Sequence, residues 1–155
     1  MKEYDVFPTM ITPYKEDGSV DYQTAEKYVQ WYFENGCNGV FAICQSSEIF
    51  YLSLEERVKL NSVVWNKAKE LEKTSGKRFT VVSSGHISES IKDQAAELNA
   101  VAKSGSDAVI LITNRLDLHD QGDDVWIANA EELLSYLPTV IKLGLYECPY
   151  PYKRL

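Results

Sequence analysis

Long apolar runs are absent from the sequence, and none approaches the roughly 18 residues that a membrane span needs. The amino terminus, residues 1–5, is charged and has no apolar core of the kind found in secretory signal peptides. The sequence therefore predicts neither a membrane-spanning protein nor a secreted one.

Cysteine is also scarce, with 3 residues in a chain of 155. Their number is odd, their spacing is wide and their neighbours are apolar, so a framework of disulfide bonds is not indicated. Thiols used in this way are typical of a reducing compartment, and we expect a cytoplasmic protein. The cysteines are Cys37, Cys44 and Cys148.

Basic residues are outnumbered, since 16 Lys and Arg against 23 Asp and Glu give a formal net charge of −7. This balance argues against nucleic acid or an anionic membrane surface as a partner. It leaves room for a small basic pocket that binds an acidic metabolite. No linker or low-complexity tract interrupts the chain, so we expect residues 1–155 to belong to a single domain.

Short apolar runs alternate with segments of helical periodicity along the chain. The runs are apolar throughout, which indicates strands of a sheet that is covered on both faces. Strict alternation of strand and helix indicates right-handed parallel crossovers and an α/β fold. The predicted strands are residues 6–12, 39–44, 79–83, 108–113 and 139–146, and the predicted helices are about 21–35, 53–73, 88–103 and 124–137.

Two α/β folds fit this pattern, the open doubly wound sheet and the TIM, or (β/α)₈, barrel. An open nucleotide-binding sheet often has a glycine-rich loop after its first strand, whereas residues 12–14 here are Thr-Pro-Tyr. A complete barrel takes about 250 residues, so five predicted strands and four predicted helices fit only part of one. The pattern by itself leaves both folds open.

Five short motifs occur in an order that narrows the choice. An apolar strand ending in Thr-Pro-aromatic precedes an Asp-Gly-x-hydrophobic-Asp turn, and Glu-x-x-x-Leu-Ser-x-x-Glu-Arg and Leu-Tyr-x-x-Pro stretches come later. The chain thereby resembles the dihydrodipicolinate synthase/N-acetylneuraminate lyase family. The resemblance implies an incomplete (β/α)₈ barrel that ends after its fifth strand. The motifs lie at residues 7–21, 36–40, 48–57, 105–109 and 145–149.

The family consists of pyruvate-dependent class I aldolases, and the resemblance implies their chemistry. A lysine amine condenses with the ketone of pyruvate or another 2-oxo acid to form a Schiff base. The Schiff base then acts as the electron sink when a carbon–carbon bond is made or broken. A tyrosine transfers protons, and hydroxyl groups bind the substrate carboxylate. The mechanism implies no metal and no cofactor.

The tyrosine of the family matches Tyr146, which we expect to be the catalytic acid/base. Residues 44–48, Cys-Gln-Ser-Ser-Glu, stand where the family usually has Gly-[Ser/Thr]-Thr-Gly-Glu. Ser46 matches the carboxylate-binding threonine, Gln45 replaces its hydroxyl neighbour and Ser47 replaces a glycine. We expect Gln45, Ser46 and Ser47 to form a substrate-binding loop.

Residues 113–116, Thr-Asn-Arg-Leu, stand where dihydrodipicolinate synthases typically have Thr-Pro-Tyr-Tyr. Leu116 replaces a second relay tyrosine. Arg115 adds a cation that we expect to meet the anionic tail of a substrate. These changes favour a divergent member of the family over dihydrodipicolinate synthesis itself.

The Schiff-base lysine of the family lies on the sixth strand, beyond the strands predicted here, so we expect this chain to be inactive alone. Lys142 lies four residues before Tyr146, on the same face of a strand, and whether it replaces the missing nucleophile stays open. The alternative is a non-catalytic part of a split barrel that self-associates or pairs with a second chain. Val6, Ile43 and Ile141 would then be exposed apolar contacts.

One acidic loop resembles a metal site in its composition. Residues 117–122 approach the spacing of a calcium loop, but Ala128 stands where the closing glutamate belongs. We expect no metal here, and acids that support the amino terminus of the next helix.

Overall fold

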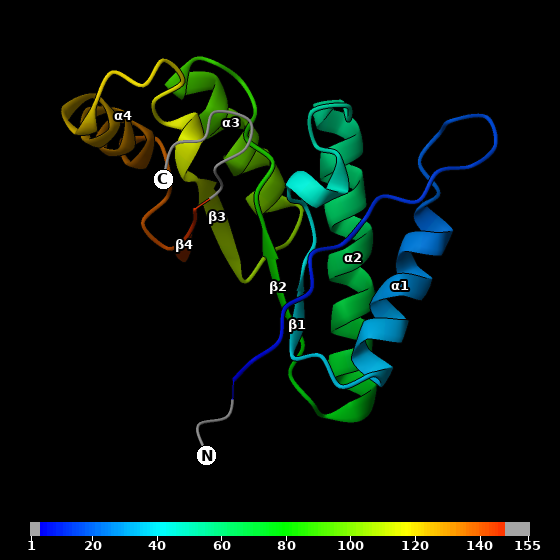
Figure 1. Ribbon diagram of the computed structural model, residues 1–155. Coiled ribbons are helices and arrows are strands. Elements are labelled where there is room, and N and C mark those ends of the chain that lie inside the picture. The colour runs from blue at the N-terminus through cyan, green and yellow to red at the C-terminus, as the bar shows by residue number, and fades with distance from the viewer. Residues whose placement is uncertain (1–3, 148–155) are drawn as a thin grey trace.

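The computed structural model describes residues 4–147 (Figure 1). It has the predicted alternation of helices and strands, with a short 3₁₀ helix after β1 and another after β3. Cys148 lies outside the described residues, and Cys37 and Cys44 are free thiols. The elements are α1 (Tyr22–Glu34), β1 (Gly39–Phe41), η1 (Gln45–Ser47), α2 (Leu54–Ser75), β2 (Thr80–Ser83), α3 (Ile91–Lys103), β3 (Ala108–Ile112), η2 (Thr113–Arg115), α4 (Asp123–Ser135) and β4 (Leu143–Tyr146).

The strands form a four-stranded sheet in chain order, β1-β2-β3-β4, and each neighbouring pair is parallel. A doubly wound sheet reverses its strand order at a switch point, and no reversal occurs between β1 and β4. The helices follow the same order, because α1 packs on α2, α2 on α3 and α3 on α4 (Figure 1). A sheet that winds in one direction with its helices in a single row is the wall of a (β/α)₈ barrel, here part of one.

Residues 6–12, the first predicted strand, are extended but do not form a regular strand. Backbone hydrogen bonds join Phe41 N–H to the Pro8 carbonyl at 2.9 Å and Met10 N–H to the Phe41 carbonyl at 3.0 Å. Thr9 makes an isolated parallel bridge to the same strand. Pro8 has no N–H to donate, and the outer edge of the segment pairs with no strand in residues 4–147. The expected five strands are therefore four strands and one extended segment beside β1.

The last predicted strand, residues 139–146, is also shorter in the structure, where β4 begins at Leu143. The Pro138 carbonyl accepts a hydrogen bond from Ile141 N–H at 3.1 Å. This turn occupies the residues that the apolar pattern had assigned to the start of the strand.

Helix termini follow the signals in the sequence. Asp21 caps α1 by accepting a hydrogen bond from Thr24 N–H at 3.0 Å. Ser53 and Glu56 form a capping box at the start of α2, and Gly76 ends this helix at φ 71°, where a side chain would be strained. Among the described helices, none is long and apolar enough to cross a membrane.

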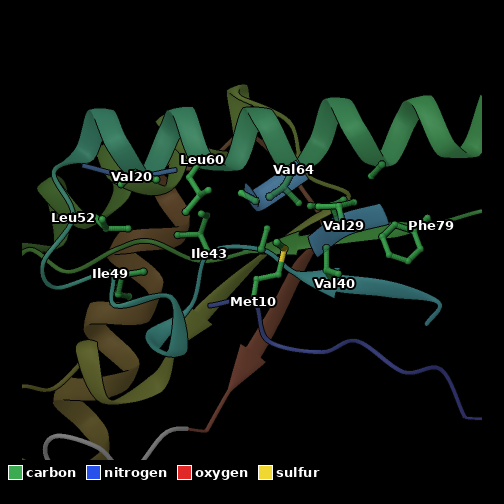
Figure 2. Packing of buried hydrophobic residues seen from close by; sticks show 14 of the residues in the cluster. Met10, Val20, Val29, Val40, Ile43, Ile49, Leu52, Leu60, Val64 and Phe79 are labelled. Carbon is green, nitrogen blue, oxygen red and sulfur yellow. The ribbon is translucent and has the colours of Figure 1, made fainter. Parts of the chain in front are cut away.

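Two apolar clusters fill the space between the sheet and the helices. Figure 2 shows the larger one, where Met10 of the first extended segment meets Val29 of α1 and Val64 of α2. The smaller cluster joins α3, β3 and α4 around residues such as Leu111 and Leu133. Both clusters join the sheet to the helices and fix its position against them.

The other side of the sheet is concave. Phe41 of β1 and Tyr146 of β4 touch across it, edge to face, with 5.8 Å between ring centroids, although β2 and β3 lie between their strands. Such curling is expected of a barrel wall. Val6 is 52% exposed and Ile141 is half-buried, but Ile43 is fully buried at 0%, so the expected exposure of Ile43 is wrong.

Candidate active site

The carboxyl ends of parallel strands share one edge of the sheet, where (β/α)₈ enzymes build their active sites. The predicted site residues all follow strands at this edge: η1 comes after β1, η2 after β3, and Tyr146 is the last residue of β4. Residues 84–90 join them after β2.

Ser47, expected to bind the substrate carboxylate, uses its hydroxyl on the backbone. The fully buried side chain donates to the Met10 carbonyl at 2.7 Å, lies 3.1 Å from the Ala42 carbonyl and accepts Cys44 N–H at 3.2 Å. Thr12 reinforces the loop by donating to the Ser47 carbonyl at 2.6 Å. Since a hydroxyl has a single proton, Ser47 holds the loop and has no donor left for a ligand in this conformation.

Ser46, by contrast, is exposed, and Gln45 beside it is half-buried. Both lie on the tight turn of η1 at the carboxyl end of β1. An exposed hydroxyl keeps its proton available for an anion. The two neighbouring serines therefore differ in their roles: the Ser46 hydroxyl is available to bind an anion, whereas the Ser47 hydroxyl holds the loop in position.

Glu48 and Tyr14 form a polar pair that links the first two loops of this edge. Glu48 closes η1 at φ 59° and ψ 36°, a left-handed conformation that strains a residue other than glycine. Burial, the hydrogen bond to Glu48 and the charge of that carboxylate raise the pKa of Tyr14 to about 12. Sequence reasoning gave Tyr14 no role, although it lies in the Thr-Pro-aromatic motif at a strand end.

Tyr146, the expected acid/base, ends β4 opposite Ile112 of β3. Its half-buried ring reaches Phe41, so it lies on the concave side of the sheet. The Thr113 hydroxyl contacts the Tyr146 carbonyl at 3.4 Å. A phenol at this place can exchange a proton with a substrate bound at the mouth of the barrel.

His86, in the loop after β2, is fully buried, and the sequence analysis gave it no role. Its Nε2 accepts Ile112 N–H at 2.8 Å, and its Nδ1 lies 2.7 Å from Gln94 Oε1. Because Nε2 accepts, the proton is on Nδ1 and the ring is neutral. Burial lowers the pKa of His86 to about 4, against the opposing effect of the Gln94 hydrogen bond. No local pattern distinguishes this residue from an exposed turn histidine.

A buried ion pair lies behind the same loop. Arg57 of α2 and Glu97 of α3 are 3.1 Å apart, with side chains 4% and 8% exposed. Arg57 also donates to the Gly85 carbonyl. Glu97 accepts the N–H groups of Ile87 and Ser88 at 2.7 and 3.0 Å. Both charges are thus matched by hydrogen bonds to the loop, which they hold against two helices.

Arg115, expected to meet the substrate, is 4% exposed. Its Nη2 donates to the Ile87 carbonyl and, at 3.2 Å, to the Ser88 carbonyl. Its guanidinium carbon lies 5.7 Å from the centroid of the Phe50 ring, which follows η1. Gln94 donates to the Arg115 carbonyl at 2.9 Å. The guanidinium therefore contacts two neighbouring loops.

Three other residues from the sequence analysis have defined places. Leu116 is fully buried in the smaller apolar cluster, and Lys142 is exposed just before β4. Asp117 accepts the N–H groups of Gln121 and Gly122, each at 3.0 Å, and closes the turn before α4. Within residues 4–147, no group of three or more His, Cys, Asp or Glu side chains is arranged to hold a metal ion.

Comparison with known proteins connects this chain to one family. Residues 2–115 match the dihydrodipicolinate synthetase family. The 4-hydroxy-tetrahydrodipicolinate synthase of Methanococcus aeolicus is 32% identical over 109 residues, which are 70% of this chain and 34% of that protein. The enzyme of the same name from Cellvibrio japonicus is 27% identical over 140 residues, 84% of this chain and 44% of that protein.

Solved structures extend the similarity to most of the chain. The chloride-inhibited dihydrodipicolinate synthase of Acinetobacter baumannii, complexed with pyruvate, superposes with a TM-score of 0.77 at 23% identity, over 94% of this chain and 46% of its own. YagE, a prophage protein of E. coli K12 also complexed with pyruvate, gives 0.76 at 16% identity, over 94% of this chain and 45% of its own. This chain thus spans less than half the length of these relatives. It belongs to the dihydrodipicolinate synthetase family and has the fold of part of that family's (β/α)₈ barrel.

Proposed function

We propose that the chain carries the carboxylate-binding and acid/base part of a Schiff-base lyase or aldolase site for pyruvate or another 2-oxo acid. One observation supports this most. Ser46 after β1 and Tyr146 at the end of β4 lie at one edge of a sheet that curls enough for Tyr146 to touch Phe41. The two solved relatives described above bind pyruvate on the same fold.

In this proposal Ser46 donates its hydroxyl proton to the substrate carboxylate, and Gln45 offers its amide beside it. Ser47 and Thr12 keep the loop in place through their backbone hydrogen bonds. Hydrogen-bond donors on a tight turn can hold an anion by their direction. Such binding does not require a positive net charge, and the net charge of this chain is −7.

Tyr146 is the proton carrier. A lysine amine attacks the ketone carbon, the new C–N bond forms, and the carbonyl oxygen takes up a proton. A second proton, which Tyr146 supplies, lets this oxygen leave as water and yields the iminium. In the family the lysine lies on the sixth strand, and Lys142 is the alternative within this chain. The chemistry requires no metal or cofactor.

The proposal is for a divergent member of the family. Leu116, buried in an apolar cluster, stands in place of a relay tyrosine, so we do not assign dihydrodipicolinate synthesis to this chain. We place the function in the cytoplasm, in line with the free thiols of Cys37 and Cys44.

Ligand-observed NMR with pyruvate tests the proposal. We expect saturation transfer from the chain to pyruvate, about tenfold weaker affinity for Ser46→Ala, and unchanged affinity for Ser62→Ala on α2. Borohydride added to the mixture should leave every lysine of this chain unlabelled, whereas a label on Lys142 would identify it as the nucleophile. Absence of transfer to pyruvate from the unaltered chain would contradict the proposal.

A second candidate function is that of one piece of an assembled barrel. Within residues 4–147 the outer edges of the first extended segment and of β4 pair with no strand. Side chains beside these edges are exposed: Ile11 by 55%, Leu143 by 45% and Leu145 by 66%. A groove of about 420 Å³ lies between the first extended segment and α1. Such edges pair with another chain, either a second copy or a complementary barrel fragment. The groove is lined by Ile11, Lys27, Tyr28, Trp31 and Tyr32.

Sedimentation velocity and thermal melting separate this candidate from a self-sufficient chain. Association that increases with concentration, or with an added complementary fragment, supports it. A monodisperse monomer that melts cooperatively contradicts it.

A further inference from the structure

Charged side chains from three different elements hold the backbone of the loop after β2. Arg57 and Glu97 bind the Gly85 carbonyl and the N–H groups of residues 87 and 88, as described above. Arg115 of η2 binds the carbonyls of residues 87 and 88. Each of these contacts goes to a backbone group of the loop, so none of them depends on the identity of the loop's side chains.

Arg115 also reaches the loop after β1 close to η1, whereas Arg57 contacts that loop only at the Ser53 carbonyl, at 3.3 Å, where α2 begins. The Arg115 guanidinium lies against Phe50, three residues beyond η1, at a distance suited to a cation–π contact. Phe50 itself is 38% exposed, and the guanidinium of Arg115 contacts its ring. A planar guanidinium can donate in its plane to carbonyls while its face contacts a ring, which an ammonium group cannot do to the same extent.

We propose that Arg115 is a positioning residue of the site: it ties the loop after β1 and the loop after β2 to η2, and thereby sets where Ser46 lies relative to Tyr146. The effect of Arg115 on the binding of a 2-oxo acid rests on the proposed function. The tie, meaning the contacts of Arg115 with the two loops, does not depend on it. The tie gives Arg115 a different role from direct contact with the tail of a substrate. The position is one where the family motif has a tyrosine, so the tie belongs to this chain's own sequence.

Hydrogen–deuterium exchange followed by mass spectrometry, without ligand, tests the tie. In Arg115→Met we expect amides of residues 44–52 and 84–90 to exchange roughly tenfold faster or more, while α1 and β1 keep their rates. Arg115→Lys should be intermediate, because its ammonium can still reach a carbonyl. The matched control is Arg78→Met. The Arg78 side chain is 66% exposed, lies 3.1 Å from Asp107 and is located at the amino ends of the strands, away from the site. Its removal should leave the exchange of both loops unchanged.

Affinity for pyruvate provides the second readout. Arg115→Met should bind about tenfold more weakly, in step with the faster exchange, and Arg78→Met should bind as the unaltered chain does. Unchanged exchange in both loops, or exchange raised equally throughout the chain, would overturn the tie. Weaker binding of pyruvate with unchanged exchange in both loops would overturn the tie too, since it would indicate that Arg115 contacts the ligand directly.

Two further outcomes are decided by the same design. If the unaltered chain binds no pyruvate, the proposed function fails, while the exchange data still test the tie. If Arg115→Met does not fold, Phe50→Leu takes its place, with faster exchange expected in residues 44–52 alone. Unchanged exchange there would count against the inference.

Discussion

His86 is the residue whose chemistry the fold changes most. The imidazole accepts the N–H of Ile112 on β3 and donates to Gln94 on α3, so a single neutral tautomer satisfies both neighbours. A second proton on the ring would displace the Ile112 hydrogen bond and place a charge in a fully buried site. The fold therefore couples the proton equilibrium of this residue to its own stability.

Acidification should destabilise the protein through His86. Its pKa falls from 6.5 to about 4 on folding, so between these values the unfolded chain binds a proton that the folded chain does not. The free energy of unfolding then decreases as the pH is lowered through this window, by a total on the order of 3 kcal/mol, and this contribution stops changing below the folded pKa.

Urea unfolding at several pH values between about 7 and about 4 measures this effect. His86→Gln should be less stable than the unaltered protein at neutral pH but should lose less stability on acidification. The comparison cancels the contribution of carboxylates such as Asp21, whose pKa is lowered by its hydrogen bonds to Thr24. Parallel losses in both proteins would contradict the assignment.

Ser46 and Ser47 offer a second test at the same scale. Ser47→Ala removes a hydrogen bond to the Met10 carbonyl and leaves the buried Cys44 N–H without its acceptor, so we expect a loss of about 1–3 kcal/mol in the free energy of unfolding. Ser46→Ala, at an exposed position, should stay within about 0.5 kcal/mol. Chemical denaturation of the pair gives the ranking, and the reverse order would refute the division of roles.

The same pair shows what the sequence could and could not reveal about the site. Family motifs placed Gln45, Ser46, Ser47, Arg115 and Tyr146 at strand ends. They could not reveal that Ser47 bonds a carbonyl 37 residues earlier, or that Arg115 bonds one 28 residues earlier. Those partners depend on how the strands are set side by side, which no local spacing encodes.

At the scale of elements, local signals worked where the interaction is local. The Asp21 cap and the Ser53–Glu56 box lie within three residues of their partners and were predictable. The extent of the first extended segment was not, because a regular strand needs pairing partners and Pro8 offers no N–H. The start of β4 likewise depended on the turn at Pro138 rather than on apolar character.

Helix α2 allows the local signal to be tested. Ser53→Ala removes the side chain that accepts Glu56 N–H at 3.2 Å and should lower the free energy of unfolding by about 1 kcal/mol. Ser62→Ala, the same change inside α2, should be neutral or slightly stabilising, because alanine is the better helix former by a few tenths of a kcal/mol. Thermal or urea unfolding compares the two. Equal effects would mean that the capping box does not stabilise the helix.

At the scale of the whole molecule, residues 4–147 form a curved wall with helices on one side and, within this part of the chain, none on the other. The helices cover the outer side, and the contact between Phe41 and Tyr146 shows how far the wall has turned. The order of strands was foreseen from alternation and family motifs together, since alternation by itself also fits an open sheet. What the open edges meet was left undecided between a second copy and a complementary fragment.

The exposed edge at β4 should drive association of the 155-residue chain. Leu145 is 66% exposed on this strand, and a lysine there would oppose edge pairing by its charge and hydration. We expect Leu145→Lys to weaken self-association about tenfold, which corresponds to roughly 1.4 kcal/mol, as measured by sedimentation over a range of concentrations. Leu54→Lys, at a position 38% exposed at the start of α2, is the matched control and should leave the association constant unchanged. An equal effect of the two changes would show that contacts other than the edge of β4 join the chains.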